Sequence, residues 1–366
     1  MTKRVIVVGA GIVGSFCALR LARSGARVTL IDGEAEDFSP GGPSASLAAA
    51  GLLTVVGHAP LAGGGQPALP DLAHEAFALW RDHSAGAAWE DGVRFEGGVV
   101  IAADAAAAEA FVAQARAAGR KAHRLAAAEF RKRTGLDAPV AGAVFVEEEG
   151  AADPPRVLSG MAFALHQLGV RVRRGVEVEA VEADPIRVRT FDDQRIEADV
   201  VVLATGIMNQ ARLARSAPAL ARMRPAKGHM VPVELAAPLP VPVRAGEFYL
   251  APREGRSAVL GATMEWDRYD RGVKQEQVRA LLDAAEKTLP GAVKQSESEL
   301  PWAGVRPMSP DGAPMIGWSG PALIAAGHSR NGWLFAPLTA EIVCAYVWGE
   351  EIPARWAALS PDRFKD

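Results

Sequence analysis

The chain opens with VIVVGAGIVG at residues 5–14, a β-branched run that leads directly into three glycines. A short run that is apolar at every position is typical of a strand buried on both faces of a parallel sheet. Residues 15–24 carry apolar side chains at helical spacing, and Gly25 supplies a C-terminal stop. Residues 26–31 read ARVTLI, which predicts a second strand that ends at Asp32. The pattern predicts a strand–helix–strand unit with a glycine-rich first turn.

This glycine turn has the chemistry of a dinucleotide site. Gly9 permits the tight turn, Gly11 leaves room for a pyrophosphate at the helix N-terminus, and Gly14 lets helix and strand pack closely. Asp32 stands about 20 residues further on, where a carboxylate accepts the ribose hydroxyls and repels a 2′-phosphate, which disfavours NADP. The pattern predicts dinucleotide binding, against the alternative of a turn that binds nothing. By itself it does not separate FAD from NAD.

Composition bounds the rest of the chain. Its 366 residues exceed the roughly 250–300 that one hydrophobic core supports, so two domains are expected. A net charge of −3 gives no electrostatic reason to expect nucleic acid as a partner. Neither Cys17 nor Cys344 has CxxC spacing, so a disulfide framework is unsupported. The seven histidines show no zinc-like spacing with cysteine or acidic partners. We therefore expect a reducing compartment and no metal site.

The first residues imitate a secretory signal, because Lys3 and Arg4 precede a mostly apolar run over 5–19. The regular glycines, and Arg20 directly after the run, favour instead the strand and helix of a cytoplasmic protein. No apolar run reaches the ~18 residues of a membrane-spanning helix. We expect cytoplasmic localisation and no integral membrane segment.

Two further strand–turn units occur far along the chain. Residues 198–206 read ADVVVLATG, and residues 322–333 read ALIAAGHSRNGW, with an apolar stripe at helical spacing over 337–348. Such repeated units suggest one extended cofactor, and no second GxGxxG is placed to hold a separate NAD. This favours FAD. The helix after Asn331-Gly332 would face the N1–C2=O end of the flavin, which becomes anionic on reduction.

Five groups of motifs are distributed along the whole chain, in an order that a known protein family shares. They are GAGIVG at 9–14 with Asp32, SLAAAGLL at 46–53, FYLAPR at 248–253 with GATME at 261–265, WAGVRP at 302–307, and GHSRNG at 327–332. Together they resemble the D-amino-acid oxidase superfamily of FAD-dependent oxidoreductases, most closely its glycine oxidase branch.

The resemblance implies an α/β fold with two domains. A discontinuous, Rossmann-like FAD-binding domain would comprise residues 1–85, 142–225 and 303–366. A smaller α+β substrate domain with a mostly antiparallel sheet would comprise residues 86–141 and 226–302. Alternating runs at 231–234 and 259–262 suit strands of that sheet, and the Ala-rich stretch near 104–134 reads as helical.

The resemblance also implies where FAD is bound. The implied contacts are Gly9, Gly11, Ile12, Val13, Gly14, Asp32, Ser46, Ala49, Ala50, Gly51, Leu52, Val178, Ala204, Thr205, Gly206, His328, Arg330, Asn331, Gly332 and Trp333. Some relatives attach FAD covalently through a cysteine near Gly304. No cysteine lies between Gly291 and Arg330, so we expect non-covalent FAD.

Amino-acid oxidation requires the protein to hold the carboxylate, orient the Cα–H and exclude water, because flavin N5 accepts the hydride. No nucleophile or metal is needed, and we assign no catalytic side chain. Arg306 matches the family arginine that clamps the substrate carboxylate, and its fork suits that task; a surface ion pair is the alternative. Tyr249 matches a tyrosine that bonds the same carboxylate, and Met264 matches a pocket-lining position. For both, an ordinary core residue is the alternative.

Alternatives stay open at other positions. The backbone around Arg330 would lie near the substrate amine, while its side chain either pairs with the cofactor or lines the way in. His328 lies in the flavin-side turn, where cofactor contact is favoured, whereas a structural role is favoured for His58. Residues 57–70, rich in Gly and Pro, read either as a lid over the substrate or as a surface connection.

The leading functional hypothesis is oxidative deamination of glycine or another small amino acid, with imine hydrolysis to an oxo acid and flavin reoxidation by oxygen. In the glycine oxidase branch this often serves thiamine biosynthesis. The alternatives are a D-amino-acid dehydrogenase that uses another electron acceptor, a sarcosine-type N-methyl amine oxidase, and a catalytically silent nucleotide-binding protein. A homo-oligomer is compatible with the sequence.

Overall fold

A six-stranded sheet organises one half of the molecule. The computed structural model describes residues 2–55 and 69–365. The sheet order is β21-β22-β13-β1-β2-β9, parallel throughout except for β21. Its strands are β1 (Arg4–Val8), β2 (Arg27–Ile31), β9 (Arg171–Arg173), β13 (Val200–Leu203), β21 (Met315–Ser319) and β22 (Ala322–Ala326). The GxGxxG stretch therefore lies where β1 ends, as predicted.

Both faces of this sheet are buried, because alternate side chains of each strand enter different cores. Val5 and Val7 of β1 pack with the helices on one face, and Ile6 and Val8 pack on the other face. The first face is covered by α1 (Ile12–Arg23), α3 (Leu69–Ser84), α6 (Pro154–Gln167) and α9 (Gly332–Trp348). The second face is covered by a small sheet of β10 (Val178–Ala183), β11 (Ile186–Thr190) and β12 (Arg195–Glu197), with α7 (Gln210–Leu213) and the 3-10 helix η2 (Pro218–Arg222).

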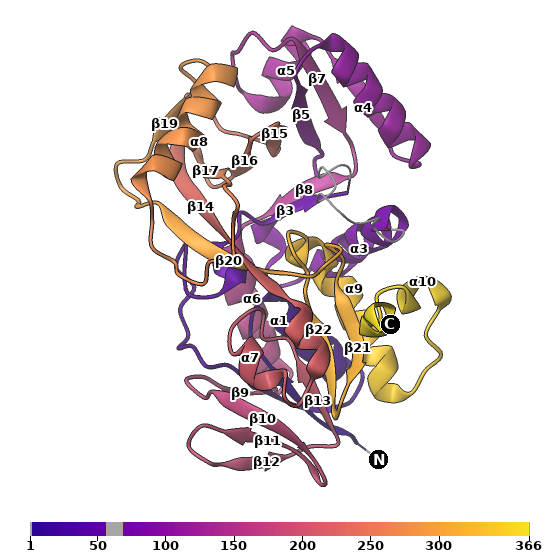
Figure 1. The fold of residues 1–366 in the computed structure, drawn as a ribbon. Helices are drawn as coiled ribbons and strands as arrows, with labels where there is room; N and C mark the ends of the chain where they lie inside the picture. Colours follow the sequence, from indigo (N-terminus) through magenta and orange to yellow (C-terminus); the bar gives the residue numbers. More distant parts are fainter. Residues whose placement is uncertain (1, 56–68, 366) are drawn as a thin grey trace.

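A ten-stranded, mostly antiparallel sheet forms the other half (Figure 1). Its strands are β5 (Gly98–Ala102), β6 (Ala122–Leu125), β7 (Gly142–Val146), β14 (Arg224–Leu235), β15 (Val243–Ala245), β16 (Phe248–Pro252), β17 (Ser257–Gly261), β18 (Glu265–Trp266), β19 (Val293–Gln295) and β20 (Trp302–Met308). The pair of β15 and β5 is parallel. Helices α4 (Ala105–Ala117), α5 (Ala127–Thr134) and α8 (Gln275–Thr288) flank this sheet.

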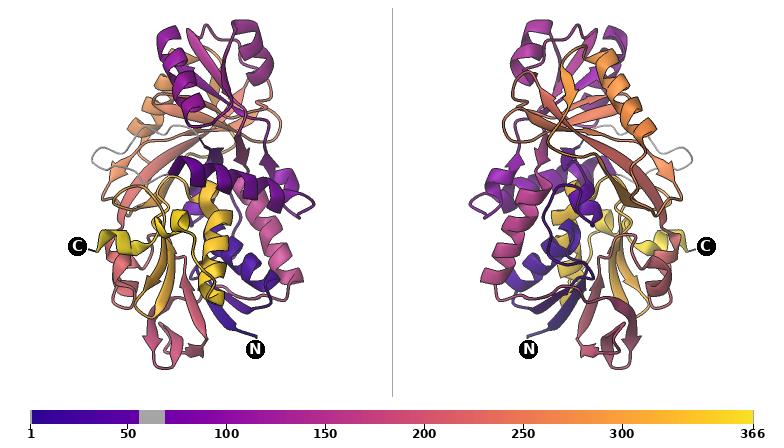
Figure 2. Two further views of the ribbon diagram at one scale, coloured as in Figure 1. Left: turned by 90° about the vertical axis from the view of Figure 1, so that its right-hand side faces the viewer. Right: turned by 90° about the vertical axis from the view of Figure 1, so that its left-hand side faces the viewer.

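Short elements complete the chain. They are α2 (Ala45–Ala48), a three-stranded sheet of β3 (Leu52–Thr54), β8 (Glu149–Ala152) and β4 (Val93–Arg94), the 3-10 helices η1 (Glu90–Gly92) and η3 (Pro361–Phe364), and α10 (Ala354–Ala357). The side views place the large sheet at one end of the molecule and the small β10–β12 sheet at the opposite end (Figure 2). The mixed α/β architecture confirms the expected fold class.

The apolar stripe over 337–348 is part of a longer helix, which starts after Asn331 as expected. Helix α9 begins at Gly332 and contains Pro337 in its interior. Proline lacks the N–H that would bond the carbonyl of Trp333, and such a break normally disrupts a helix. Here the indole Nε1 of Trp80 on α3 donates to that carbonyl at 2.7 Å. A partner distant in sequence thus satisfies the orphaned carbonyl.

The Ala-rich stretch near 104–134 is not wholly helical, which corrects the expectation. Gly119, with φ of +71°, follows α4, and the chain then enters strand β6. This strand pairs with β7, and its Ala122 and Leu125 are buried. Pairing and burial outweigh the helical propensity of alanine. Because β7 belongs to the large sheet, we propose to keep the two-domain division but to move its boundary at residue 141 to 146.

Candidate active site

Two adjoining cavities lie between the sheets. The larger is a cleft of ≈ 340 Å³ at the carboxyl ends of β1, β2 and β13, and the smaller is a cavity of ≈ 90 Å³ beneath β14 and β20. The residues that line both are Ala45, Ala49, Val305, Arg306, Arg330 and Trp333. Because the two cavities share these walls, a cofactor in the cleft could meet a small molecule in the cavity.

The glycine turn is shaped by close backbone approach. Gly9 has φ of +102°, and a Cβ there would lie 2.4 Å from the carbonyl oxygen of Ala204. A Cβ at Gly14 would lie 1.8 Å from the carbonyl oxygen of Gly9, so the helix packs directly on the turn. Gly11 is the N-cap of α1, whose first N–H, that of Ile12, donates to Ser46 Oγ at 2.9 Å. The turn leaves the helix N-terminus facing the cleft, where it favours an anion.

Asp32 is held by the backbone at the end of β2. Its Oδ2 accepts from the N–H of Ala10 at 2.5 Å, and its Oδ1 accepts from the N–H of Glu34 at 2.8 Å. Arg174 lies 3.9 Å from Oδ2. The carboxylate lines the cleft in a fixed orientation, as recognition of a ribose requires.

The cleft fits a dinucleotide. The hydroxyl of Thr205, in the turn after β13, is buried and has no hydrogen-bond partner among the described residues, although it lines the cleft. Buried polar groups normally have partners, so this hydroxyl points to a ligand. Together with the α1 N-terminus and Asp32, it provides the donors and acceptors that a pyrophosphate and a ribose require.

The start of α9 forms the other end of the cleft. Gly332 and Trp333 line it, and the Trp333 indole donates to the carbonyl of Ser46 at 3.1 Å. His328 also lines the cleft, and its Nε2 lies 2.9 Å from the hydroxyl of Thr339. Burial lowers the pKa of His328 from 6.5 to about 3, so its ring is neutral at physiological pH.

Arg306 and Tyr249 meet in the small cavity. Arg306 Nη1 donates to the carbonyl of Thr263 at 3.2 Å, which leaves further guanidinium N–H groups for a ligand. The Tyr249 hydroxyl contacts the sulfur of Met230 at 3.4 Å. Burial raises the pKa of Tyr249, while the positive charge of Arg306 opposes that rise. The phenol therefore stays protonated and can donate to an anion.

A second guanidinium, that of Arg330, also lines the small cavity. Burial, and then the charge of Arg306, lowers the pKa of Arg330. Arg253, beside the cavity wall, is turned instead to the protein backbone, because it donates to the carbonyls of Ala50 and Pro252 at 3.2 and 3.0 Å. The cavity therefore presents positive charge and a phenolic donor, which suits a small carboxylate.

Most of the predicted cofactor residues converge on these cavities. Those that line the cleft are Gly9, Gly11, Ile12, Val13, Asp32, Ser46, Ala49, Val178, Ala204, Thr205, Gly206, His328, Arg330, Gly332 and Trp333. Ala50, Gly51 and Leu52 line only the small cavity. Gly14 and Asn331 line neither, since Gly14 packs against the turn and Asn331 caps α9. The functional roles of all these residues stay predictions.

Met264 does not line the small cavity, although the sequence suggested that it does. Met264 lies in the short connection between β17, which ends at Gly261, and β18, which begins at Glu265. Met230, which pairs opposite Gly261 on β14, lines the cavity. The position of Met230 in the cavity wall could not be predicted, because a Met in an apolar strand gives no local signal of it. Predictions for His58 and most of the 57–70 segment fall outside the described residues.

Within 2–55 and 69–365, no group of three or more His, Cys, Asp or Glu could hold a metal ion. Over the same ranges, no helix has the length and apolar character needed to cross a membrane.

Comparison with known proteins agrees with this geometry. The family described as "FAD dependent oxidoreductase" (DAO) matches residues 4–346. A glycine oxidase of Bacillus licheniformis is 27% identical over 365 residues, which cover 97% of this chain and 96% of that protein. The bifunctional protein ThiO/ThiG of Synechocystis sp. is 29% identical over 241 residues, which cover 63% of this chain but only 36% of that longer protein. The crystal structure of glycine oxidase from Geobacillus kaustophilus is covered completely, at 26% identity and a TM-score of 0.84.

Proposed function

We propose, because this chain belongs to the DAO family of FAD-dependent oxidoreductases, that it catalyses the oxidative deamination of glycine or another small amino acid. One observation carries the proposal. Arg306 and Tyr249 line a cavity of ≈ 90 Å³ that shares its walls with the cofactor cleft. An anion-binding pair directly beside a flavin site suits a substrate that presents a carboxylate.

In this proposal Arg306 binds the substrate carboxylate through its planar fork, and the hydroxyl of Tyr249 donates to the same group. The carbonyl of Thr263 orients the guanidinium before the substrate arrives. Ala48, Ala49, Ala50 and Gly51 line the cavity, whose volume of ≈ 90 Å³ suits a small substrate. Positioning of this kind contributes to rate by holding the Cα–H in a reactive orientation.

The bound flavin would supply the redox chemistry, since it accepts a hydride from Cα and later passes the electrons to oxygen. The residues around it need only bind, orient and exclude water. Released imine reacts with water to give the oxo acid and ammonia. Overall, the amino acid, oxygen and water would give an oxo acid, ammonia and hydrogen peroxide.

The first experiment is anaerobic mixing of the yellow holoenzyme with a panel of amino acids and N-methyl amines, while the flavin band is recorded. Glycine or another small amino acid should bleach the band, and air should restore it with release of peroxide. Bleaching without peroxide would favour a dehydrogenase, and faster bleaching by sarcosine would favour an N-methyl amine oxidase. If no amino acid or amine bleached the band, the proposal would fall.

A further inference from the structure

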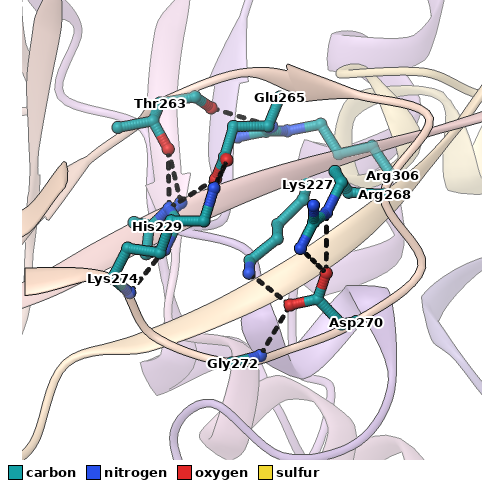
Figure 3. A network of polar contacts seen from close by, with 9 residues as sticks. All are labelled: Lys227, His229, Thr263, Glu265, Arg268, Asp270, Gly272, Lys274 and Arg306. Carbon is teal, nitrogen blue, oxygen red and sulfur yellow. Dashed lines mark hydrogen bonds and ion pairs between the residues drawn. The ribbon is translucent and has the colours of Figure 1, made fainter.

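A segment from Thr263 to Lys274, which includes the short strand β18 of the large sheet, leads to α8, and both of its ends are bonded to one residue. Beyond β18 it forms a loop. Thr263 Oγ1 accepts from the backbone N–H of His229 at 3.0 Å and lies 2.9 Å from His229 Nδ1. The backbone N–H of Lys274 donates to His229 Nε2 at 3.1 Å (Figure 3). His229 is buried on β14, so the base of the loop is fixed to this strand.

The middle of the loop is fixed to the same strand by an ion pair. The ammonium of Lys227, which is completely buried, donates to Asp270 Oδ1 at 2.6 Å. Asp270 also accepts from Arg268 Nε at 2.9 Å and from the N–H of Gly272 at 3.2 Å (Figure 3). A buried ammonium is costly unless it is paired, so Lys227 strongly favours this position of Asp270.

The residues on either side of Asp270 reach the cofactor cleft. Tyr269 and Arg271 both line it, although they belong to the loop from the large sheet. The Tyr269 hydroxyl donates to Gln210 Oε1 at 3.4 Å. Gln210 begins α7, which follows the six-stranded sheet, so the loop bridges the two halves of the molecule beside the cleft.

The guanidinium of Arg271 is exposed at this position, whereas the neighbouring Arg268 is paired with Asp270 and does not line the cleft. No salt bridge of Arg271 occurs among the described residues 2–55 and 69–365. FAD carries an anionic pyrophosphate, and a guanidinium matches phosphate oxygens in charge and geometry. Arg271 therefore has the chemistry to bind the cofactor in the cleft that it lines.

We propose that residues 266–273 form a cofactor cover, in which Arg271 binds the pyrophosphate of FAD and the Lys227–Asp270 ion pair holds the loop in place. This inference rests on FAD binding and goes beyond the proposed amino-acid chemistry. It assigns the cover a role in retaining FAD, so its effect is on the affinity and the release rate of the cofactor.

The test measures FAD binding to FAD-free protein, by quenching of flavin fluorescence, and FAD release after dilution. R271Q should raise the Kd for FAD about tenfold, as expected for loss of a charge-assisted hydrogen bond. R279Q, an equal charge change on the exposed surface of α8, should bind FAD like the unaltered protein. Unchanged FAD affinity in R271Q overturns the proposal, and an equal loss in R279Q does so as well.

The anchor is tested by the double variant K227M/D270N, which removes both charges and leaves no buried ammonium without a partner. Circular dichroism verifies its fold. Faster FAD release supports the anchoring role, and release at the rate of the unaltered protein overturns it. Bleaching of R271Q by the amino acid at saturating FAD is recorded separately. A failure of bleaching alone contradicts the proposed reaction, whereas a failure of the Kd to change contradicts the cover.

Discussion

Gly228 and Arg306 are packed so closely that a Cβ at residue 228 would lie 2.4 Å from both terminal nitrogens of the guanidinium. The two residues belong to the paired strands β14 and β20, in which Arg306 stands opposite Ala226. The guanidinium thus lies over the one position of β14 that has no side chain. The absence of a Cβ at Gly228 makes room for the proposed carboxylate clamp.

Replacement of Gly228 by alanine should therefore displace the clamp without unfolding the protein, because the end of a long side chain can shift. We expect the KM for the amino acid to rise about tenfold, the effect of losing one good charge-assisted bond. Steady-state kinetics measure it. G246A is the matched control, because a Cβ there meets no atom of the described part of the chain within 4 Å. Equal KM values for G228A and G246A would contradict the prediction.

Replacement of Arg306 by lysine keeps the charge but removes the planar fork. We expect the KM for the amino acid to rise by about 10- to 100-fold, and R306A should be affected more strongly. The binding of a non-reacting carboxylate, followed through perturbation of the flavin spectrum, should weaken in parallel. An unchanged KM in R306A would refute the clamp.

Replacement of Tyr249 by phenylalanine removes one donor and leaves the ring. The expected rise in KM is about three- to tenfold, smaller than for Arg306, since a neutral donor contributes less. Because burial raises the pKa of Tyr249, its ionisation should add no inflection to the rate profile below pH 10. A matching alkaline inflection that disappears in Y249F would show that this assignment is wrong.

His328 should make the FAD-free protein sensitive to acid. Its pKa is lowered from 6.5 to about 3 in the folded state, so the unfolded chain binds the extra proton between these values. The contribution of neutral His328 to the free energy of unfolding is therefore complete above pH 6.5. It is lost as the pH falls towards 3, by up to about 1.4 kcal/mol per pH unit. Urea unfolding at several pH values tests this. H328Q should lose that part of the slope, whereas H166Q, altered at an exposed residue of α6, should keep it.

The flavin should dissociate when the protein is denatured. Cys17 and Cys344 are both buried within the core formed by α1 and α9. Burial raises the pKa of each thiol, which disfavours the reactive thiolate. Acid precipitation should therefore leave all of the yellow colour in the supernatant. Flavin that stayed in the pellet after washing would indicate a covalent bond.

The sequence by itself determined the nucleotide half of the protein. The strand, the glycines of the first turn and Asp32 are encoded locally, because each depends on backbone geometry within one βα unit. Family motifs also located Arg306 and Tyr249, which the structure brings to one cavity.

Only the tertiary structure decided which distant residues complete the site. Met230 lines the small cavity because strand pairing sets it opposite Gly261. Helix α9 continues through Pro337 because an indole from α3 satisfies the freed carbonyl. The loop at 263–274 reaches the cleft because His229 and Lys227 hold it to β14. Each of these outcomes depends on contacts between segments far apart in sequence, which no local pattern of residues encodes.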